Sequence, residues 1–113
     1  MPGATFEPFD VVVVPFPFTD KVAVKRRPTL VVSTKAFNER HEQLMLAMIT
    51  SARLSDWPSD VHLEDWRKAG LVAPCRVRFK LFTLEKALVI RRMGSLAEGD
   101  CGAVRKVLAD CLV

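Results

Sequence analysis

The stretch FDVVVVPFPF, from Phe9 to Phe18, decides the fold, because β-branched and aromatic residues follow one another in it almost without a break. A run of this length is too short for a solitary helix and favours a buried β-strand. Pro15 and Pro17 remove two backbone donors on the same side of that strand. Its second half is therefore expected to lie at a sheet edge or in a bulge, where the sheet curls.

Three later segments continue this β pattern. RRPTLVVS, from Arg26 to Ser33, predicts a second strand, which the polar loop from Asp20 to Lys25 joins to the first as a hairpin. LMLAMIT, from Leu44 to Thr50, and ALVIRRM, from Ala87 to Met93, predict two more strands. Residues 34–43 are polar and aperiodic, which indicates a loop or a single helical turn.

The segment from Val72 to Leu84 predicts a half-buried strand with one basic face. Before it, Val61 to Leu63 predicts a short strand, and Glu64 to Ala69 predicts a helical turn that ends at Gly70. Alternation along the longer strand gives one face with Arg76, Arg78 and Lys80 and an opposite face with Cys75, Val77, Phe79 and Leu81.

The C-terminal segment predicts a helix. Ser95 stands three residues before Glu98, as in a capping box that begins a helix. Five or six short strands and one helix indicate a small barrel with the terminal helix packed on it. The apolar residues that recur at helical spacing are Cys101, Val104, Leu108 and Cys111, with Val107 and Leu112 beside them.

Length and composition limit the classes of protein that this chain can be. Its 113 residues are enough for one compact domain, and no apolar run approaches the roughly 20 residues that cross a bilayer. The N-terminus lacks the pattern of a secretory signal, so we expect a cytoplasmic protein. Three cysteines without ligand spacing indicate neither a disulfide framework nor a zinc site. A net charge of +4 is a modest bias toward an anionic partner.

Four patches, in this order and spacing, resemble toxins of the MazF/PemK/Kid family. They are FDVVVVPFPFTD, KRRPTLVVS, MITS at the end of the third predicted strand, and RFKLFTLEKALVIRRMGSL from Arg78 to Leu96. The resemblance implies a mainly β fold, a small partly open β-barrel of the CcdB/MazF toxin type with a C-terminal helix packed on it. It also implies a single toxin domain over residues 1–113.

The same resemblance implies the toxin component of a type II toxin–antitoxin system. Such a protein is a sequence-selective endoribonuclease that cuts single-stranded RNA as a homodimer and is inhibited by a cognate antitoxin. The ribose 2′-hydroxyl attacks the adjacent phosphate, which leaves a 2′,3′-cyclic phosphate and a 5′-hydroxyl. Because the RNA brings its own nucleophile, no metal and no cofactor is expected, and no membrane is involved.

Arg27 and Thr50 match the two essential residues of the family. A guanidinium can bind a pentavalent phosphate with two parallel hydrogen bonds, and a hydroxyl at a strand end can hold a phosphate oxygen or the attacking 2′-hydroxyl. Two structural alternatives stay open. In one, Arg27 caps the hairpin or pairs with Asp10, and in the other, Thr50 is buried and bonded to backbone. Asp10 matches an aspartate of the family's first motif and is interpreted as structural.

Basic and hydroxyl side chains near these two residues predict an RNA-binding groove, although a solvated basic face would have the same composition. Some relatives carry an aspartate, the proposed base, where this chain has Lys80. His41 and His62 are the only side chains that ordinarily titrate near neutrality, but both lie in polar stretches and are left out of the predicted site. The predicted RNA-binding residues are Lys25, Arg26, Ser51, Arg76, Arg78 and Lys80.

Two other functions remain open. A degenerate relative would fold and bind an antitoxin or nucleic acid without cutting, and Lys80 in place of a carboxylate is the observation that favours it. A gyrase poison like CcdB would carry a tryptophan in its C-terminal tripeptide. This chain ends Cys111, Leu112 and Val113, which argues against that reading.

Overall fold

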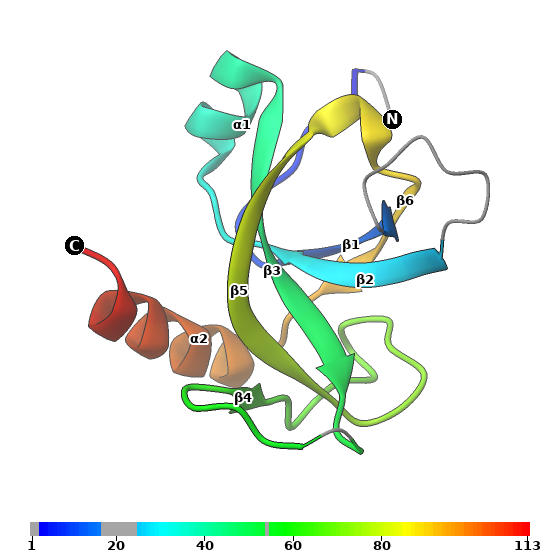
Figure 1. Cartoon of the computed structure of the whole chain (residues 1–113). Coiled ribbons are helices and arrows are strands. Elements are labelled where there is room, and N and C mark those ends of the chain that lie inside the picture. Colours follow the sequence, from blue (N-terminus) through cyan, green and yellow to red (C-terminus); the bar gives the residue numbers. More distant parts are fainter. Residues whose placement is uncertain (1–2, 17–24, 54) are drawn as a thin grey trace.

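The computed structural model describes residues 3–16, 25–53 and 55–113, and within them six strands form one curled sheet (Figure 1). The sheet order is β4-β5-β3-β2-β1-β6, and every neighbouring pair is antiparallel. The helix α1 lies at the beginning of β3, and α2 lies beside β4 (Figure 1). The elements are β1 (Asp10–Phe16), β2 (Lys25–Val31), α1 (Lys35–His41), β3 (Gln43–Ser51), β4 (Val61–His62), β5 (Cys75–Glu85), the 3-10 turn η1 (Lys86–Leu88), β6 (Arg91–Ser95) and α2 (Glu98–Cys111).

The first predicted strand is confirmed as β1, which lies between β2 and β6. It pairs with β2 from Val11 to Phe16, but its register with β6 covers only Asp10 to Val13. Pro15 therefore lies in the half of β1 that is at a sheet edge within the described part of the chain, as its missing donor predicts. Pro17 and most of the predicted loop from Asp20 to Lys25 fall outside the described residues.

The sheet buries both of its faces, which explains why β1 is apolar without alternation. On one face, Val11 and Val77 belong to a core that α2 covers through Val104. On the other face, Val12 and Val14 belong to a second core inside the curl of the sheet. The predicted mainly β, half-open barrel with a C-terminal helix is therefore confirmed.

Two local predictions differ from the structure, one in the extent of a helix and one in the position of a strand. The segment 34–43 contains the two-turn helix α1, whose first turn is capped by the Thr34 hydroxyl as it accepts a hydrogen bond from Phe37 N at 3.2 Å. The strand expected over Ala87 to Met93 begins only at β6. The chain turns first through η1, where the buried Lys86 pairs with Glu42 at 3.0 Å.

The capping box predicted at Ser95 and Glu98 is also wrong. The Ser95 hydroxyl donates to Asp10 Oδ1 at 3.1 Å, and α2 begins after Ala97 without a side-chain cap. The predicted apolar stripe of α2 is confirmed where it meets the first core. No described helix has the length and apolar character that a membrane span needs.

The turn before β5 is confirmed at its last residue but is not helical. Gly70 has a φ of +85°, as expected for a residue in the left-handed region. A Cβ at this position would lie 2.4 Å from the carbonyl oxygen of Met93, so a side chain is excluded by contact as well as by conformation. Gly70 thereby fixes the segment after β4 against β6.

Candidate functional site

Arg27, Thr50, Arg76 and His62 lie in one row across four neighbouring strands. Thr50 of β3 is paired with Arg76 of β5, which is paired in turn with His62 of β4. The β2–β3 register ends at Thr29 opposite Met48, and two further steps set Arg27 opposite Thr50. Directly opposite residues share a sheet face, so all four side chains belong to the face of the second core.

The beginning of β2 is a run of three exposed cations, Lys25, Arg26 and Arg27. Arg27 forms no ion pair with any described residue. The carboxylate that was its alternative partner is engaged elsewhere, because Asp10 Oδ2 lies 3.2 Å from Nε of Arg92. The pairing of Arg27 with Asp10 is thus excluded, and the structural interpretation of Asp10 is confirmed.

Thr50 differs from the buried threonine that precedes it on the same face. Thr29 is fully buried, and its hydroxyl donates to the carbonyl of Val12 at 3.2 Å. Thr50 is only half-buried, and its hydroxyl makes no hydrogen bond to the described residues. The backbone-bonded alternative therefore describes Thr29 and not Thr50. Ser51 is exposed beside it and accepts a hydrogen bond from Arg53 N at 3.2 Å.

Arg76 corrects the prediction of an exposed basic face. Its alternation is as predicted, but its side chain is 0% exposed and its guanidinium is hydrogen-bonded to Asp56. It also donates to the carbonyl of Ser51 at 3.4 Å. Burying a guanidinium costs free energy unless it is paired. These contacts provide that pairing, so the charge of Arg76 stabilises the fold. In this conformation Arg76 has no surface to offer a ligand.

Arg78 is engaged in a similar way, with the same loop. Its Nε and Nη2 bind the two carboxylate oxygens of Asp60 at 3.2 and 2.9 Å, and Nη2 also donates to the carbonyl of Ser55 at 2.7 Å. A fork of this kind is the strongest ordinary ion-pair geometry. Arg76 and Arg78 thus hold the loop after β3 against β5, a role that spacing alone did not indicate.

The Asp60 side chain is 3% exposed, yet it stays ionised. Burial alone would raise the pKa of this carboxyl, but the hydrogen bonds from Arg78 and from Trp57 N, with the nearby guanidinium charges, bring the pKa below its ordinary value. The hydrogen bond to Asp60 correspondingly raises the pKa of Arg78. The pair is therefore fully charged at neutral pH.

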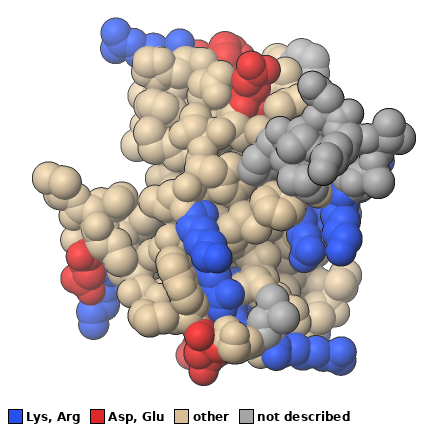
Figure 2. Space-filling model, viewed as in Figure 1, with Lys and Arg blue, Asp and Glu red and all other residues tan. Residues whose placement is uncertain are grey.

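Lys80 remains exposed on the same face of β5. The β3–β5 register skips Phe79 and Lys80, and this bulge carries the ammonium to 5.6 Å from the ring of Trp57. In Figure 2, cationic side chains lie over β5 and at the beginning of β2, with uncharged surface between these two places. Lys25, Arg26, Arg27 and Lys80 are thus the predicted cations that the structure leaves exposed.

Hollows border this row on two sides. A cavity of about 550 Å³ lies at the end of β3 and is lined by Ser51 and Arg53, among others. Another of about 310 Å³ lies between Met48 and Lys80. Within the described residues, no three His, Cys, Asp or Glu side chains come together as a group of metal ligands.

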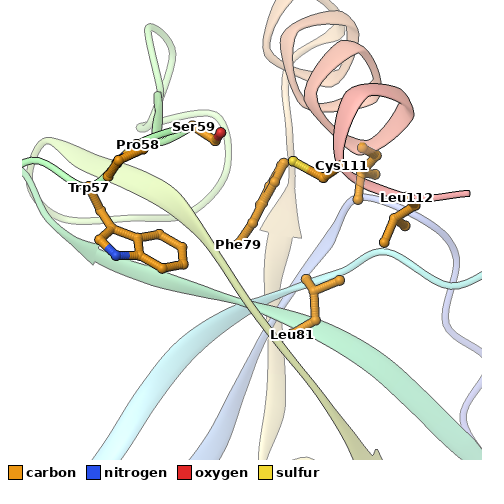
Figure 3. A pocket seen from close by; sticks show the side chains of 8 residues that line it. Trp57, Pro58, Ser59, Phe79, Leu81, Cys111 and Leu112 are labelled. Carbon is orange, nitrogen blue, oxygen red and sulfur yellow. The ribbon is translucent and has the colours of Figure 1, made fainter.

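A third cavity, apolar and of about 390 Å³, lies between β5 and the end of α2. Figure 3 shows Trp57 and Phe79 at one side of this cavity and Leu112 at the other, with Leu81 below. Its apolar lining makes it a surface for packing rather than for phosphate chemistry.

The model of one protein family, described as the PemK-like, MazF-like toxin of type II toxin–antitoxin systems, matches residues 7–112. The chain belongs to this family. The resemblance found in its motifs is thereby confirmed, and this PemK/MazF-family chain is a type II toxin by membership. No curated protein sequence matches it.

Solved structures of MazF-type toxins share the fold of this PemK/MazF-family chain. One is an endoribonuclease in complex with its cognate antitoxin from a mycobacterial species, with a TM-score of 0.73, 17% identity, and coverage of 94% of this chain and 91% of that one. Another is MazE–MazF from Deinococcus radiodurans, with a TM-score of 0.72, 19% identity, and coverage of 95% and 94%. MazF alone from the same organism gives 0.73, 19%, 95% and 96%.

Proposed function

We propose that this toxin is a metal-independent endoribonuclease that cuts single-stranded RNA at selected sequences. The observation that carries the proposal is the placement of Arg27 and Thr50 on one sheet face of neighbouring strands, both without a side-chain partner among the described residues. Family membership supports the same activity. Side chains left unengaged at such a position are available for a substrate.

Each residue has a role that its chemistry suits. The Arg27 guanidinium neutralises the non-bridging oxygens of the phosphate as it becomes pentavalent. The Thr50 hydroxyl holds a phosphate oxygen or orients the attacking 2′-hydroxyl, and Ser51 assists beside it. Lys25, Arg26 and Lys80 attract the neighbouring phosphates. Of the predicted RNA-binding residues, Arg76 and Arg78 act indirectly, by holding the loop that borders the site.

The partners follow from the same family. We infer a cognate antitoxin, because toxins of this family are paired with one and a solved relative is bound to its own. We also infer a homodimer in the cytoplasm, where the RNA substrate is found. Apolar side chains that one domain leaves exposed, among them Leu81 and Leu112, support association with a second copy.

A non-cutting relative is the second candidate. Lys80 stands where some relatives have a carboxylate, and both Arg76 and Arg78 form ion pairs within the protein. A protein of this kind would keep its antitoxin and RNA affinity but leave the RNA intact.

Cleavage of a long single-stranded RNA in the presence of EDTA distinguishes the two. The proposal expects discrete cuts with 2′,3′-cyclic phosphate ends, and a loss of cutting of at least about 100-fold in Arg27→Ala and Thr50→Ala. Thr29→Ser is a matched control, because its hydroxyl serves the fold. Intact RNA at every concentration of the wild-type protein would favour the non-cutting relative.

A further inference from the structure

We propose that His62 is the proton acceptor of the cleavage reaction and that Asp56 positions it. The inference rests on the proposed ribonuclease activity. It assigns the role of proton acceptor, which Lys80 cannot take in place of the carboxylate of some relatives. Its basis is the row of paired residues that joins His62 to Thr50 through Arg76. A proton acceptor that works near neutral pH is the one role for which the exposed cations are unsuited, since lysine and arginine stay protonated there.

The position of His62 suits contact with a substrate held at Thr50. Two strand spacings separate their backbones, about 10 Å. That span is short enough for an imidazole on one side and a hydroxyl on the other to touch the same nucleotide. The His62 side chain is 61% exposed, so its ring is accessible to RNA. Val61, its neighbour, points the other way into the core that α2 covers.

A carboxylate beside the imidazole gives it an orienting partner. His62 Nε2 lies 3.7 Å from Asp56 Oδ1. The same oxygen accepts a hydrogen bond from the fully buried Arg76, which also donates to the carbonyl of Ser51. Asp56 is thus joined to the backbone next to Thr50 through a fully buried cation. A histidine oriented by an acidic group in this way is a recurrent arrangement for proton transfer.

The other histidine offers no such arrangement. His41 lies in α1, where its ring is 4.6 Å from that of Phe37. The chain enters β3 after Glu42, and the seven steps along the strand from Gln43 to Thr50 span about 23 Å. His41 is therefore remote from the row and serves as a matched control.

The chemical step balances with water as the only other reactant. Neutral His62 accepts the proton of the 2′-hydroxyl while the O2′–P bond forms and the P–O5′ bond breaks. The 5′-oxygen leaves as an alkoxide and takes its proton from water at the exposed face. The imidazolium that forms is stabilised by Asp56 and then releases its proton to solvent. Arg27 holds the phosphate charge throughout.

The charged groups that face His62 determine how the rate depends on pH. They are Asp56 and Asp60 from the loop after β3, and Arg76 and Arg78 from β5. Because the base must be neutral to accept a proton, kcat/KM for RNA should rise with pH from the acidic side and then level off.

The test compares wild type, His62→Gln and His41→Gln on one RNA from pH 5 to 9. We expect His62→Gln to lose about 10²- to 10⁴-fold in kcat/KM at pH 7.5, and its kcat/KM should no longer rise with pH. His41→Gln should match the wild type. Binding of an RNA that carries a 2′-deoxynucleotide at the cut should be unchanged in His62→Gln, and added imidazole should partly restore cutting by His62→Ala.

Each outcome decides between the two proposals. If wild type cuts, Arg27→Ala does not, and His62→Gln stays within threefold of wild type with the same pH profile, the assignment of His62 is overturned while the ribonuclease proposal stands. If the wild-type protein cuts no RNA, both are overturned.

Asp56→Asn gives a second readout. The Asp56 carboxylate holds the imidazole in place, so its loss should lower kcat while KM for RNA stays unchanged. An unchanged kcat would contradict the positioning role, and the thermal unfolding midpoint of the variant separates this effect from a loss of fold.

Discussion

At the scale of single residues, the proposed site is distinguished by polar side chains that have no side-chain partner among the described residues. Thr29 and Thr50 share a sheet face, but only the Thr29 hydroxyl donates a hydrogen bond to the backbone. Arg27 and Arg76 likewise share a row, and only Arg76 is buried in ion pairs. Residue type could not separate these cases, because burial and pairing depend on strands that are distant in sequence.

Arg27→Lys is the sharpest substitution at this scale. Lysine keeps the charge but lacks the planar fork that binds two phosphate oxygens at once. We therefore expect kcat to fall by about 100-fold or more, with a smaller change in the affinity for RNA. Single-turnover cleavage and a binding isotherm measure the two effects separately. A variant with wild-type kcat would show that Arg27 contributes charge alone.

At the scale of elements, the predictions succeeded where the pattern was long. The strand alternation of β5 and the apolar stripe of α2 were both predicted correctly. The predictions failed where a short segment contacts a residue that is distant in sequence. Ser95 forms a hydrogen bond to Asp10 and does not cap the helix. Lys86 forms an ion pair with Glu42, and the predicted strand begins later than expected. The row across β4, β5 and β3 depends on register, which no local pattern specifies.

The loop after β3 depends on one buried carboxylate. Asp60→Asn would leave Arg78 without its fork, and we expect a loss on the order of 2–3 kcal/mol in the free energy of unfolding at pH 7. Because the pKa of Asp60 is lowered in the folded state, its contribution is present at neutral pH and is lost as the pH falls below about 4. Denaturant unfolding at pH 7 and at pH 3 measures this difference.

The control for that variant is Asp110→Asn, at an exposed position on α2. It should leave the unfolding midpoint unchanged at both pH values. Equal stability of Asp60→Asn and wild type at pH 7 would mean that the loop is held by other contacts.

At the scale of the whole molecule, the residues of the proposed catalytic row do not line the apolar cavity, which adjoins the basic face at Leu81. The cavity beside Leu81 and Leu112 suits a protein partner, whereas the exposed cations of β2 and β5 suit RNA. Binding a second copy through the cavity would therefore leave the row of Arg27 and Thr50 uncovered.

Leu81→Lys tests this division. A charge in the apolar cavity should weaken self-association by about 10-fold or more. Leu88→Lys places the same charge on an equally exposed leucine in η1 and should have no effect. Sedimentation across micromolar concentrations measures both, and a wild-type protein that stays monomeric there would contradict the inferred dimer.

The number of residues in the bulge of β5 determines which face of the sheet each later side chain occupies. Because the β3 register skips two residues and not one, the inward and outward sense of every side chain is the same before and after the bulge. Removing a single residue there would turn either the cations or the leucines of β5 to the wrong side, whereas removing the pair would only straighten the strand. Length changes in this segment should therefore be tolerated across evolution in steps of two.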